Sequence, residues 1–147
     1  MRSVQSMKKI LFVCIHNSAR SQMAEAFVNS LYSDQFAAES AGLEAGKLNP
    51  IVVEAMSEVG IDISNNQAKT VDDILAKGTE YDFVVTVCDE ANAERCPTFP
   101  GPGQRLHWGF PDPSALTGDS DGKLQQTRVI RDAIGQQLKQ WCLASEG

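Results

Sequence analysis

The chain of 147 residues is long enough for one domain with a hydrophobic core and too short for two ordinary domains. Its composition, with 42% hydrophobic and 22% charged residues, is that of an ordinary globular protein and excludes a disordered chain or a fibrous repeat. A formal net charge of -6 argues against nucleic acid as the main partner, and any anion site must be built locally from backbone N–H groups and a placed cation.

The N-terminus is expected to lie outside the domain. Met7-Lys8-Lys9-Ile10 reads like a natural start, so we assign the domain to residues 7–147 and interpret residues 1–6 as a loose extension. The apolar run from Ile10 to Ile15 is too short for a signal peptide or a membrane span. We therefore expect a cytoplasmic monomer without membrane contact, whose four cysteines are reduced thiols.

The first predicted unit is a strand, a loop and a helix. Residues 8–14 form a short apolar run typical of a buried parallel strand, and a polar loop follows it. From Ser21 to Leu31, apolar residues recur at helical spacing and predict an amphipathic helix. This order of elements opens an α/β fold.

Strands and helices continue to alternate along the chain. Residues 36–41 predict a second strand ending at Gly42, and Asn49-Pro50 predicts the start of a helix that Gly60 closes. We further expect a short helix over 72–77, strands over 81–88 and 105–108, and a final amphipathic helix marked by Val129, Ile130, Ala133, Ile134, Leu138 and Trp141. Because ligands bind outside the carboxyl ends of parallel strands, Cys14 and Cys88 are expected at one edge of the molecule.

Cys14 and Arg20 enclose the loop between the first strand and the first helix. A loop that leads into a helix N-terminus aims backbone N–H groups at one point, where the helix dipole adds positive charge. Arg20 can chelate two oxygens of a tetrahedral oxyanion, and the same setting favours the thiolate of Cys14, the candidate nucleophile. The alternative is a core cysteine with a surface arginine nearby. The expected oxyanion-binding loop is Cys14, Ile15, His16, Asn17, Ser18, Ala19 and Arg20.

Two further polar residues suit this chemistry. Ser21 can donate a hydrogen bond to the thiolate sulfur or cap the helix, and the two uses are compatible. Asp112 lies before Pro113 among apolar residues, which favours its protonated form and suits it to donate a proton to a leaving oxygen. An ordinary turn aspartate is the alternative. Trp108 and Phe110 are expected to be packing residues.

The other cysteines have different settings. Cys88 and Cys96 frame a polar segment, and a disulfide between them needs Cα atoms within about 7 Å, which requires the segment to bend or partly unwind. Neither the spacing nor nearby histidines match a zinc site, so we expect no metal and no bound cofactor. Cys142 is expected to be a core or half-buried thiol on the last helix.

The segment CIHNSARSQMAEA, residues 14–26, closely resembles the start of the arsenate reductases built on the low-molecular-weight tyrosine phosphatase fold. The similarity extends over nearly the whole chain. It includes Ser40-Ala41-Gly42, Asn49-Pro50, Glu54-Ala55-Met56, Ile61-Asp62-Ile63-Ser64, Val84-Val85-Thr86-Val87-Cys88, Cys96-Pro97, His107-Trp108-Gly109-Phe110 and Asp112-Pro113. The resemblance implies an α/β single domain with an open four-stranded parallel sheet and helices on both faces.

The resemblance also implies a reaction and its partners. The Cys14 thiolate attacks arsenate held by the loop and Arg20, Asp112 protonates the departing oxygen, and Cys88 attacks Cys14 to release arsenite. Cys96 then forms a disulfide with Cys88 that thioredoxin or a similar dithiol protein reduces. Arsenate is the expected substrate, in arsenic detoxification, with phosphate or sulfate as competing anions.

The chain departs from the family pattern at two places. The interval between Cys88 and Cys96 is longer by one residue than in the family members considered. Some members also bind potassium through residues corresponding to Asn17, Glu25, Ser40 and an aspartate, and this chain has Lys69 in place of that aspartate. We expect no potassium requirement and hypothesise that the Lys69 ammonium takes the role of the ion.

Two other functions compete with arsenate reduction. A protein tyrosine phosphatase would use Cys14, Arg20 and Asp112 equally well, but such enzymes usually have a tyrosine shortly after the Asp-Pro pair, where this chain has Ser114-Ala115-Leu116. Cys88 and Cys96 also have no purpose in ester hydrolysis, although weak phosphatase activity is compatible with the site. A non-catalytic oxyanion- or redox-sensing module is the second alternative.

Overall fold

The structure is a computed structural model that describes residues 8–14, 20–33, 35–42, 48–66, 69–78, 80–87, 103–110 and 116–145. Side chains are described as far as Cys142. The predicted N-terminal extension, residues 1–6, lies outside this part of the chain.

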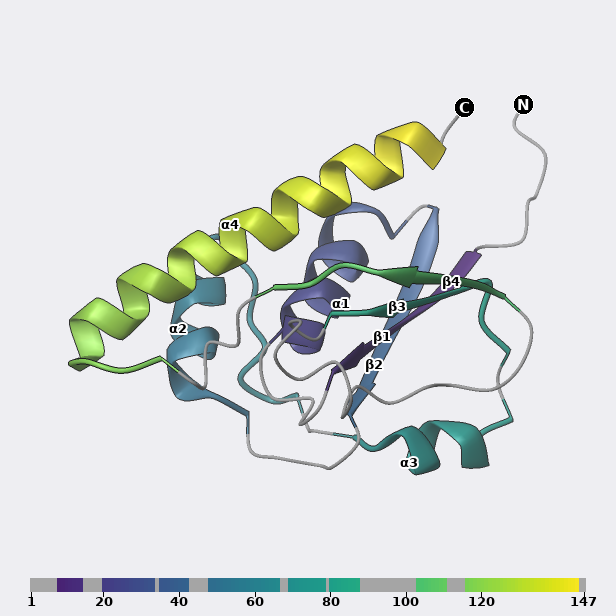
Figure 1. Ribbon diagram of the computed structural model, residues 1–147, viewed down its shortest axis with the longest axis horizontal. Helices are drawn as coiled ribbons and strands as arrows, with labels where there is room; N and C mark the ends of the chain where they lie inside the picture. Colours follow the sequence, from purple (N-terminus) through teal and green to yellow (C-terminus); the bar gives the residue numbers. More distant parts are fainter. Residues whose placement is uncertain are drawn as a thin grey trace.

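Four parallel strands form one sheet, as the sequence predicts (Figure 1). They are β1 (Lys8–Cys14), β2 (Phe36–Gly42), β3 (Phe83–Thr86) and β4 (Gln104–His107), in the order β2-β1-β3-β4. Cys14 pairs with Gly42, Val13 pairs with Thr86, and Thr86 pairs with His107. The carboxyl ends of all four strands therefore meet at one edge of the sheet.

Helices cover both faces of this sheet. On one face, α1 (Arg20–Leu31), α2 (Pro50–Ser57) and the long α4 (Ser120–Ser145) pack together, and α4 crosses the other two (Figure 1). On the other face lies the short helix α3 (Val71–Ala76). Alternation along β1 explains the two cores, because Ile10 and Phe12 enter the first and Leu11 and Val13 the second. The predicted two-sided α/β fold is confirmed.

Local signals fix where the helices begin. Asn49 caps α2 by accepting a hydrogen bond from the N–H of Ile51 at 2.9 Å, and Pro50 occupies the first helical turn. Thr70 and Asp73 form a capping box, so α3 starts one residue earlier than predicted. Helix α2 ends at Ser57 and the chain turns through Gly60, whose φ of 81° suits glycine.

The boundaries of the later elements differ from the predictions. Strand β3 is shorter than the predicted 81–88, and β4 starts one residue before the predicted 105–108. Helix α4 begins at Ser120, well before its first marked apolar residue, Val129. Val129 and Leu31 belong to the apolar spacing that predicted these helices, yet they are 67% and 60% exposed. Before Val129, the residue of α4 that is buried is the polar Thr127, and apolar periodicity does not detect such a position.

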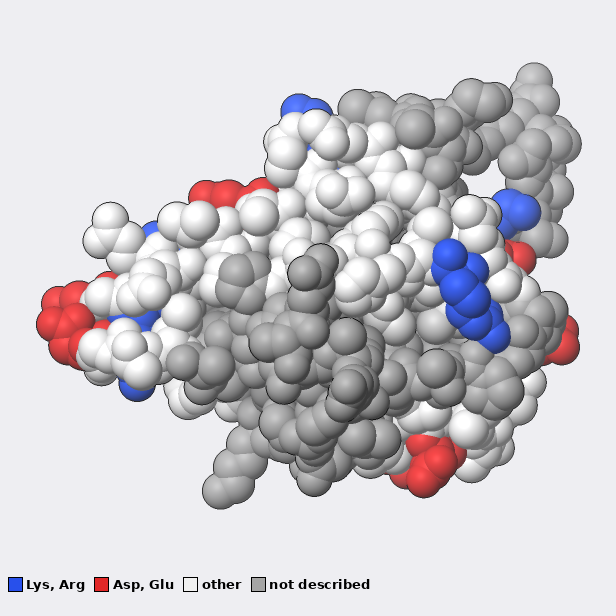
Figure 2. All heavy atoms as spheres, viewed as in Figure 1, with Lys and Arg blue, Asp and Glu red and all other residues white. Residues whose placement is uncertain are grey.

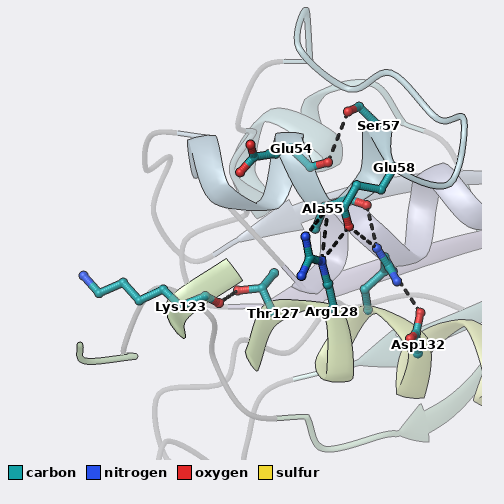
Figure 3. A network of polar contacts seen from close by, with 9 residues as sticks. Glu54, Ala55, Ser57, Glu58, Lys123, Thr127, Arg128 and Asp132 are labelled. Carbon is teal, nitrogen blue, oxygen red and sulfur yellow. Dashed lines mark hydrogen bonds and ion pairs between the residues drawn. The ribbon is translucent and has the colours of Figure 1, made fainter. Parts of the chain in front are cut away.

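The seam between α2 and α4 is polar and charged (Figure 3). Arg128 binds Glu58 in a bidentate contact, with N–O distances of 2.9 and 2.6 Å. Arg131 is 8% exposed and donates to the carbonyl of Ala55 and to Glu58, each at 2.9 Å, and its Nε donates to Asp132 at 2.8 Å. The hydrogen bonds from Arg128 and Arg131 outweigh the effect of burial and lower the pKa of Glu58 to about 2.

An aromatic cluster holds the last turns of α4 against the sheet. The ring of Trp141 lies 5.2 Å from Phe36, 4.9 Å from Phe83 and 5.7 Å from Trp108, measured between ring centroids. Trp108 also lies 6.3 Å from Phe12. Such rings stabilise through buried area and edge contacts, so the chain just after β4 is fixed to the core. None of the helices in the described ranges is long and apolar enough to span a membrane.

Candidate functional site

Cys14 and Arg20 lie at the junction of β1 and α1. Cys14 is the last residue of β1 and Arg20 the first of α1, and each is 2% exposed. The side chain of Ser21 is fully buried and its Oγ lies 2.8 Å from the Sγ of Cys14. Because α1 begins at Arg20, Ser21 belongs to the first turn of the helix rather than to its cap position. Of its two predicted uses, the contact with the thiol is the one observed.

The guanidinium of Arg20 is anchored from the far side of the site. Its Nη1 donates to the carbonyl oxygen of Phe110 at 3.1 Å, across 90 positions of sequence. Phe110 is 8% exposed and belongs to the main core, as predicted for a packing residue. The sequence analysis missed the role of its carbonyl, because a backbone acceptor leaves no side-chain pattern to detect.

A cluster of charged and hydroxyl side chains connects α1 to β2 and to the residue before Thr70. The Oγ of Ser40 donates to Oε1 of Glu25 at 2.5 Å, and the Nζ of Lys69 lies 3.7 Å from the same oxygen. Ser40 is fully buried, and the side chains of Glu25 and Lys69 are 16% and 35% exposed. The carbonyl of Lys69 also accepts from the N–H of Gly42 at 2.8 Å, which ties Lys69 to the end of β2. Glu25, Ser40 and Lys69, three positions discussed for a potassium ion, thus lie together, and Lys69 brings a positive charge to them.

Gln22 is a buried polar residue that the sequence analysis did not single out. It is 1% exposed, and its Oε1 accepts a hydrogen bond from Nδ2 of Asn66 at 3.1 Å. This contact connects the first turn of α1 to the segment after α2. Its position directly after Ser21, within a predicted amphipathic helix, was the available signal, since a glutamine there interrupts the apolar face.

A second charged cluster lies where β2 faces α3. Glu39 accepts from the hydroxyl of Tyr81 at 2.8 Å and pairs with Lys77. Burial raises the pKa of Glu39, but the hydrogen bonds from Lys77 and Tyr81 outweigh this effect and the net shift is downward. Burial and the Glu39 carboxylate raise the pKa of Tyr81, so the phenol stays protonated. This cluster connects β2 to the end of α3 and to the segment just before β3.

Several predicted site residues lie outside the described part of the chain: Ile15, His16, Asn17, Ser18, Ala19, Cys88, Cys96 and Asp112. Their neighbours are described. Val87, which precedes Cys88, is fully buried and donates its N–H to the carbonyl of Val13 at 2.9 Å. The chain that leads to Cys88 therefore runs beside the end of β1.

The surface charge agrees with a locally built anion site. On the face shown in Figure 2, the described Lys and Arg side chains lie apart from one another, and carboxylates gather where α4 begins. Asp119 and Asp121 lie at that helix start and are exposed. Within the described ranges, no three His, Cys, Asp or Glu side chains lie together as a metal site would require. Positive charge for an oxyanion is available at the start of α1, where Arg20 lies.

The chain matches the family described as low molecular weight phosphotyrosine protein phosphatase over residues 9–146. It is 45% identical over 135 residues to an arsenate reductase of Bacillus subtilis, covering 91% of this chain and 94% of that protein.

Two solved structures share the fold. One, described as an arsenate reductase in the phosphate binding state, is 32% identical, with a TM-score of 0.71 and coverage of 92% of this chain and 96% of the other. The other is a thioredoxin-dependent arsenate reductase of Corynebacterium glutamicum, 26% identical with a TM-score of 0.62, covering 97% of this chain and 65% of that one.

Proposed function

Since the chain belongs to the low-molecular-weight phosphotyrosine protein phosphatase family, and within it to the arsenate reductases, we propose that it reduces arsenate through a relay of Cys14, Cys88 and Cys96. It is an oxidoreductase of that family. The observation that carries the proposal is the buried thiol of Cys14 at the end of β1, 2.8 Å from the hydroxyl of Ser21 in the first turn of α1.

Arsenate binding is the first step. The N–H groups at the start of α1 and the Arg20 guanidinium attract the oxyanion. The Ser21 hydroxyl donates to the Cys14 thiolate, which attacks arsenic and forms an S–As bond while an As–O bond breaks. Asp112 supplies the proton that lets the oxygen leave as hydroxide or water. Arsenic is still As(V) after this step.

Reduction occurs in the second step. The Cys88 thiolate attacks the sulfur of Cys14, the S–S bond forms, and the electron pair of the S–As bond goes to arsenic, which leaves as arsenite. Two thiols have then lost two electrons, and As(V) has gained them. The backbone contact between Val87 and Val13 supports this step, because it brings the chain before Cys88 beside the end of β1.

The third step passes the oxidation outward. Cys96 attacks Cys88, Cys14 is released as a thiolate, and the Cys88–Cys96 disulfide becomes the substrate of an external dithiol. The thioredoxin dependence of the Corynebacterium glutamicum relative supports thioredoxin or a similar protein as this reductant. We place the reaction in arsenic detoxification, in a cytoplasmic monomer with no bound cofactor, where phosphate and sulfate compete for the loop.

The same fold serves phosphate ester hydrolysis, so the chemistry of the thiols separates the two reactions. Arsenate and phosphate have nearly the same shape and charge, but As(V) accepts electrons from thiols and phosphate does not. A hydrolase needs only one cysteine, whereas the relay needs three.

The test is the consumption of NADPH in the presence of arsenate, thioredoxin and thioredoxin reductase. We expect turnover in the wild type and its loss in Cys14→Ser, Cys88→Ser and Cys96→Ser. Cys142→Ser is the matched control, because Cys142 lies on α4, is 1% exposed and belongs to the main hydrophobic core. If the wild type hydrolyses aryl phosphates without reducing arsenate and Cys88→Ser is harmless, the phosphatase function replaces this one.

Lys69 supports a reaction without potassium. Its ammonium lies 3.7 Å from the Glu25 carboxylate, which Ser40 also contacts, so a positive charge is already present in this cluster. We expect equal turnover in sodium and potassium salts at the same ionic strength. A clear activation by potassium would contradict this role of Lys69.

A further inference from the structure

We propose that Phe110 is a positioning residue whose carbonyl holds the Arg20 guanidinium in the orientation that binds the oxyanion and ties it to the segment carrying Asp112. The inference rests on the proposed function, and it adds a residue that the sequence pattern assigned only to packing. The contact concerned is the 3.1 Å hydrogen bond from Nη1 of Arg20 to the Phe110 oxygen.

The guanidinium is planar, so one contact restricts the direction of the whole group. A hydrogen bond through Nη1 fixes the plane of the guanidinium and therefore the direction of its opposite edge, formed by Nε and Nη2. That edge has the geometry for a bidentate contact with an oxyanion. The acceptor is a neutral carbonyl, which orients the cation without cancelling its charge. Arg20 is 2% exposed, so water contributes little to this orientation.

The carbonyl can act as an anchor because its own segment is fixed on two sides. The ring of Phe110 is buried in the main core, with 8% of its surface exposed. Two residues earlier, the N–H of Trp108 donates to the carbonyl of Thr86 at 2.8 Å, and the ring of Trp108 packs on Phe12 and Trp141. Loss of the Phe110 ring would remove one of these two fixed points, so the carbonyl would be held less firmly.

The same segment leads to the proposed acid. Asp112 follows Phe110 by two residues, so their Cα atoms are at most about 7 Å apart. Arg20 and Asp112 act on the same oxyanion in the proposed reaction, one in binding and one in proton transfer. The bond to Phe110 orients the cation that takes part in both binding and reaction, so its loss should affect both binding and turnover.

Binding of inorganic phosphate to the reduced protein tests the anchor separately from arsenate chemistry. The readout is the phosphate concentration that halves the rate of Cys14 alkylation by iodoacetamide, followed on the Cys14 peptide by mass spectrometry. For Phe110→Ala we expect this concentration to rise about tenfold, because the backbone carbonyl remains but is no longer fixed by the ring, so its hydrogen bond to the charged guanidinium is weakened. For Phe110→Leu, which keeps most of the packed volume, we expect a rise of about twofold.

Ile134→Ala is the matched control for loss of packing. Ile134 is fully buried in the same core on α4, and its substitution should lower the melting temperature without changing phosphate protection. In the arsenate assay, Phe110→Ala should raise KM and lower kcat together, whereas Ile134→Ala should leave both within about twofold at a temperature where the protein is folded.

Two results would overturn the inference: unchanged phosphate protection in folded Phe110→Ala, or the same weakening in Ile134→Ala. If Phe110→Ala does not fold, Phe110→Val is measured by the same criterion. Failure of the wild type to reduce arsenate would contradict the proposed function alone, because the phosphate measurement needs no turnover.

Discussion

Two buried arginines, Arg20 at the start of α1 and Arg131 in the middle of α4, show how the same side chain serves two purposes. Arg20 is 2% exposed and Arg131 is 8% exposed, and each donates to a distant backbone carbonyl. Arg131 also binds the carboxylates of Glu58 and Asp132. Its charge is therefore matched inside the protein, as in a structural contact between helices.

The comparison explains how an acidic protein with a net charge of -6 can hold an oxyanion. A carboxylate partner neutralises a guanidinium, whereas the Phe110 carbonyl that accepts from Arg20 is a neutral group, so this contact orients the cation without removing its charge. The start of α1 adds its dipole to that charge. The α2–α4 seam joins two helices, and under the proposed function the β1–α1 junction provides the positive potential for chemistry.

The largest expected effect is on activity at Arg20. Arg20→Lys keeps the charge but loses the planar fork, so we expect kcat/KM for arsenate to fall by about 100-fold or more. Arg131→Lys, the matched change in the seam, should leave kcat/KM within about twofold. Steady-state kinetics of the two variants check the prediction, and equal losses in both would break the comparison.

The next largest effect is expected at Ser21, in the β1–α1 junction. Ser21→Ala removes the hydroxyl 2.8 Å from the Cys14 sulfur, and we expect kcat to fall about tenfold because a hydrogen bond to a charged sulfur is lost. Ser21→Thr keeps the hydroxyl and should retain more of the rate. The stopped-flow rate of the first turnover measures the effect, and full activity of Ser21→Ala would show that the contact is only structural.

In the seam, the expected effect is on stability. Arg131→Met keeps the aliphatic stem but removes the donor to Ala55 and the pair with Glu58, so unfolding free energy should fall by roughly 1–3 kcal/mol. Urea unfolding measures the change. A variant as stable as the wild type would mean that the network in Figure 3 contributes nothing net.

The smallest expected effect is on acid stability. The two arginines lower the pKa of Glu58 from 4.5 to about 2, so the carboxylate stabilises the folded state above its ordinary pKa and this contribution is lost as the pH falls toward 2. Glu58→Gln should therefore be slightly less stable near neutral pH and lose less stability between about pH 5 and 2. Melting temperatures across that range test it, and parallel curves for the two proteins would be the contrary result.

Side-chain patterns predicted most of the fold and part of the site. The apolar run of β1, the caps at Asn49 and the strand leading to Val87 are local signals, and the structure confirms them. The sulfur–hydroxyl contact of Cys14 was also one of two uses predicted for Ser21.

Side-chain patterns in the sequence could not predict packing by polar residues or contacts made by the backbone. The first half of α4 packs partly through Arg128, Arg131 and the buried Thr127, so apolar spacing could not mark where the helix begins. The Phe110 carbonyl was missed because every residue carries the same acceptor, and only the fold decides which one faces Arg20. For the same reason Gln22 and Asn66, partners across 44 positions, could not be paired from sequence.

The three-thiol relay is tested most directly by one turnover of the Cys96→Ser variant with excess arsenate and no reductant. The relay predicts one arsenite per protein and a Cys14–Cys88 disulfide in the peptide map. Arsenite release without a disulfide at Cys88, or a Cys14–Cys88 disulfide without arsenite, would contradict it.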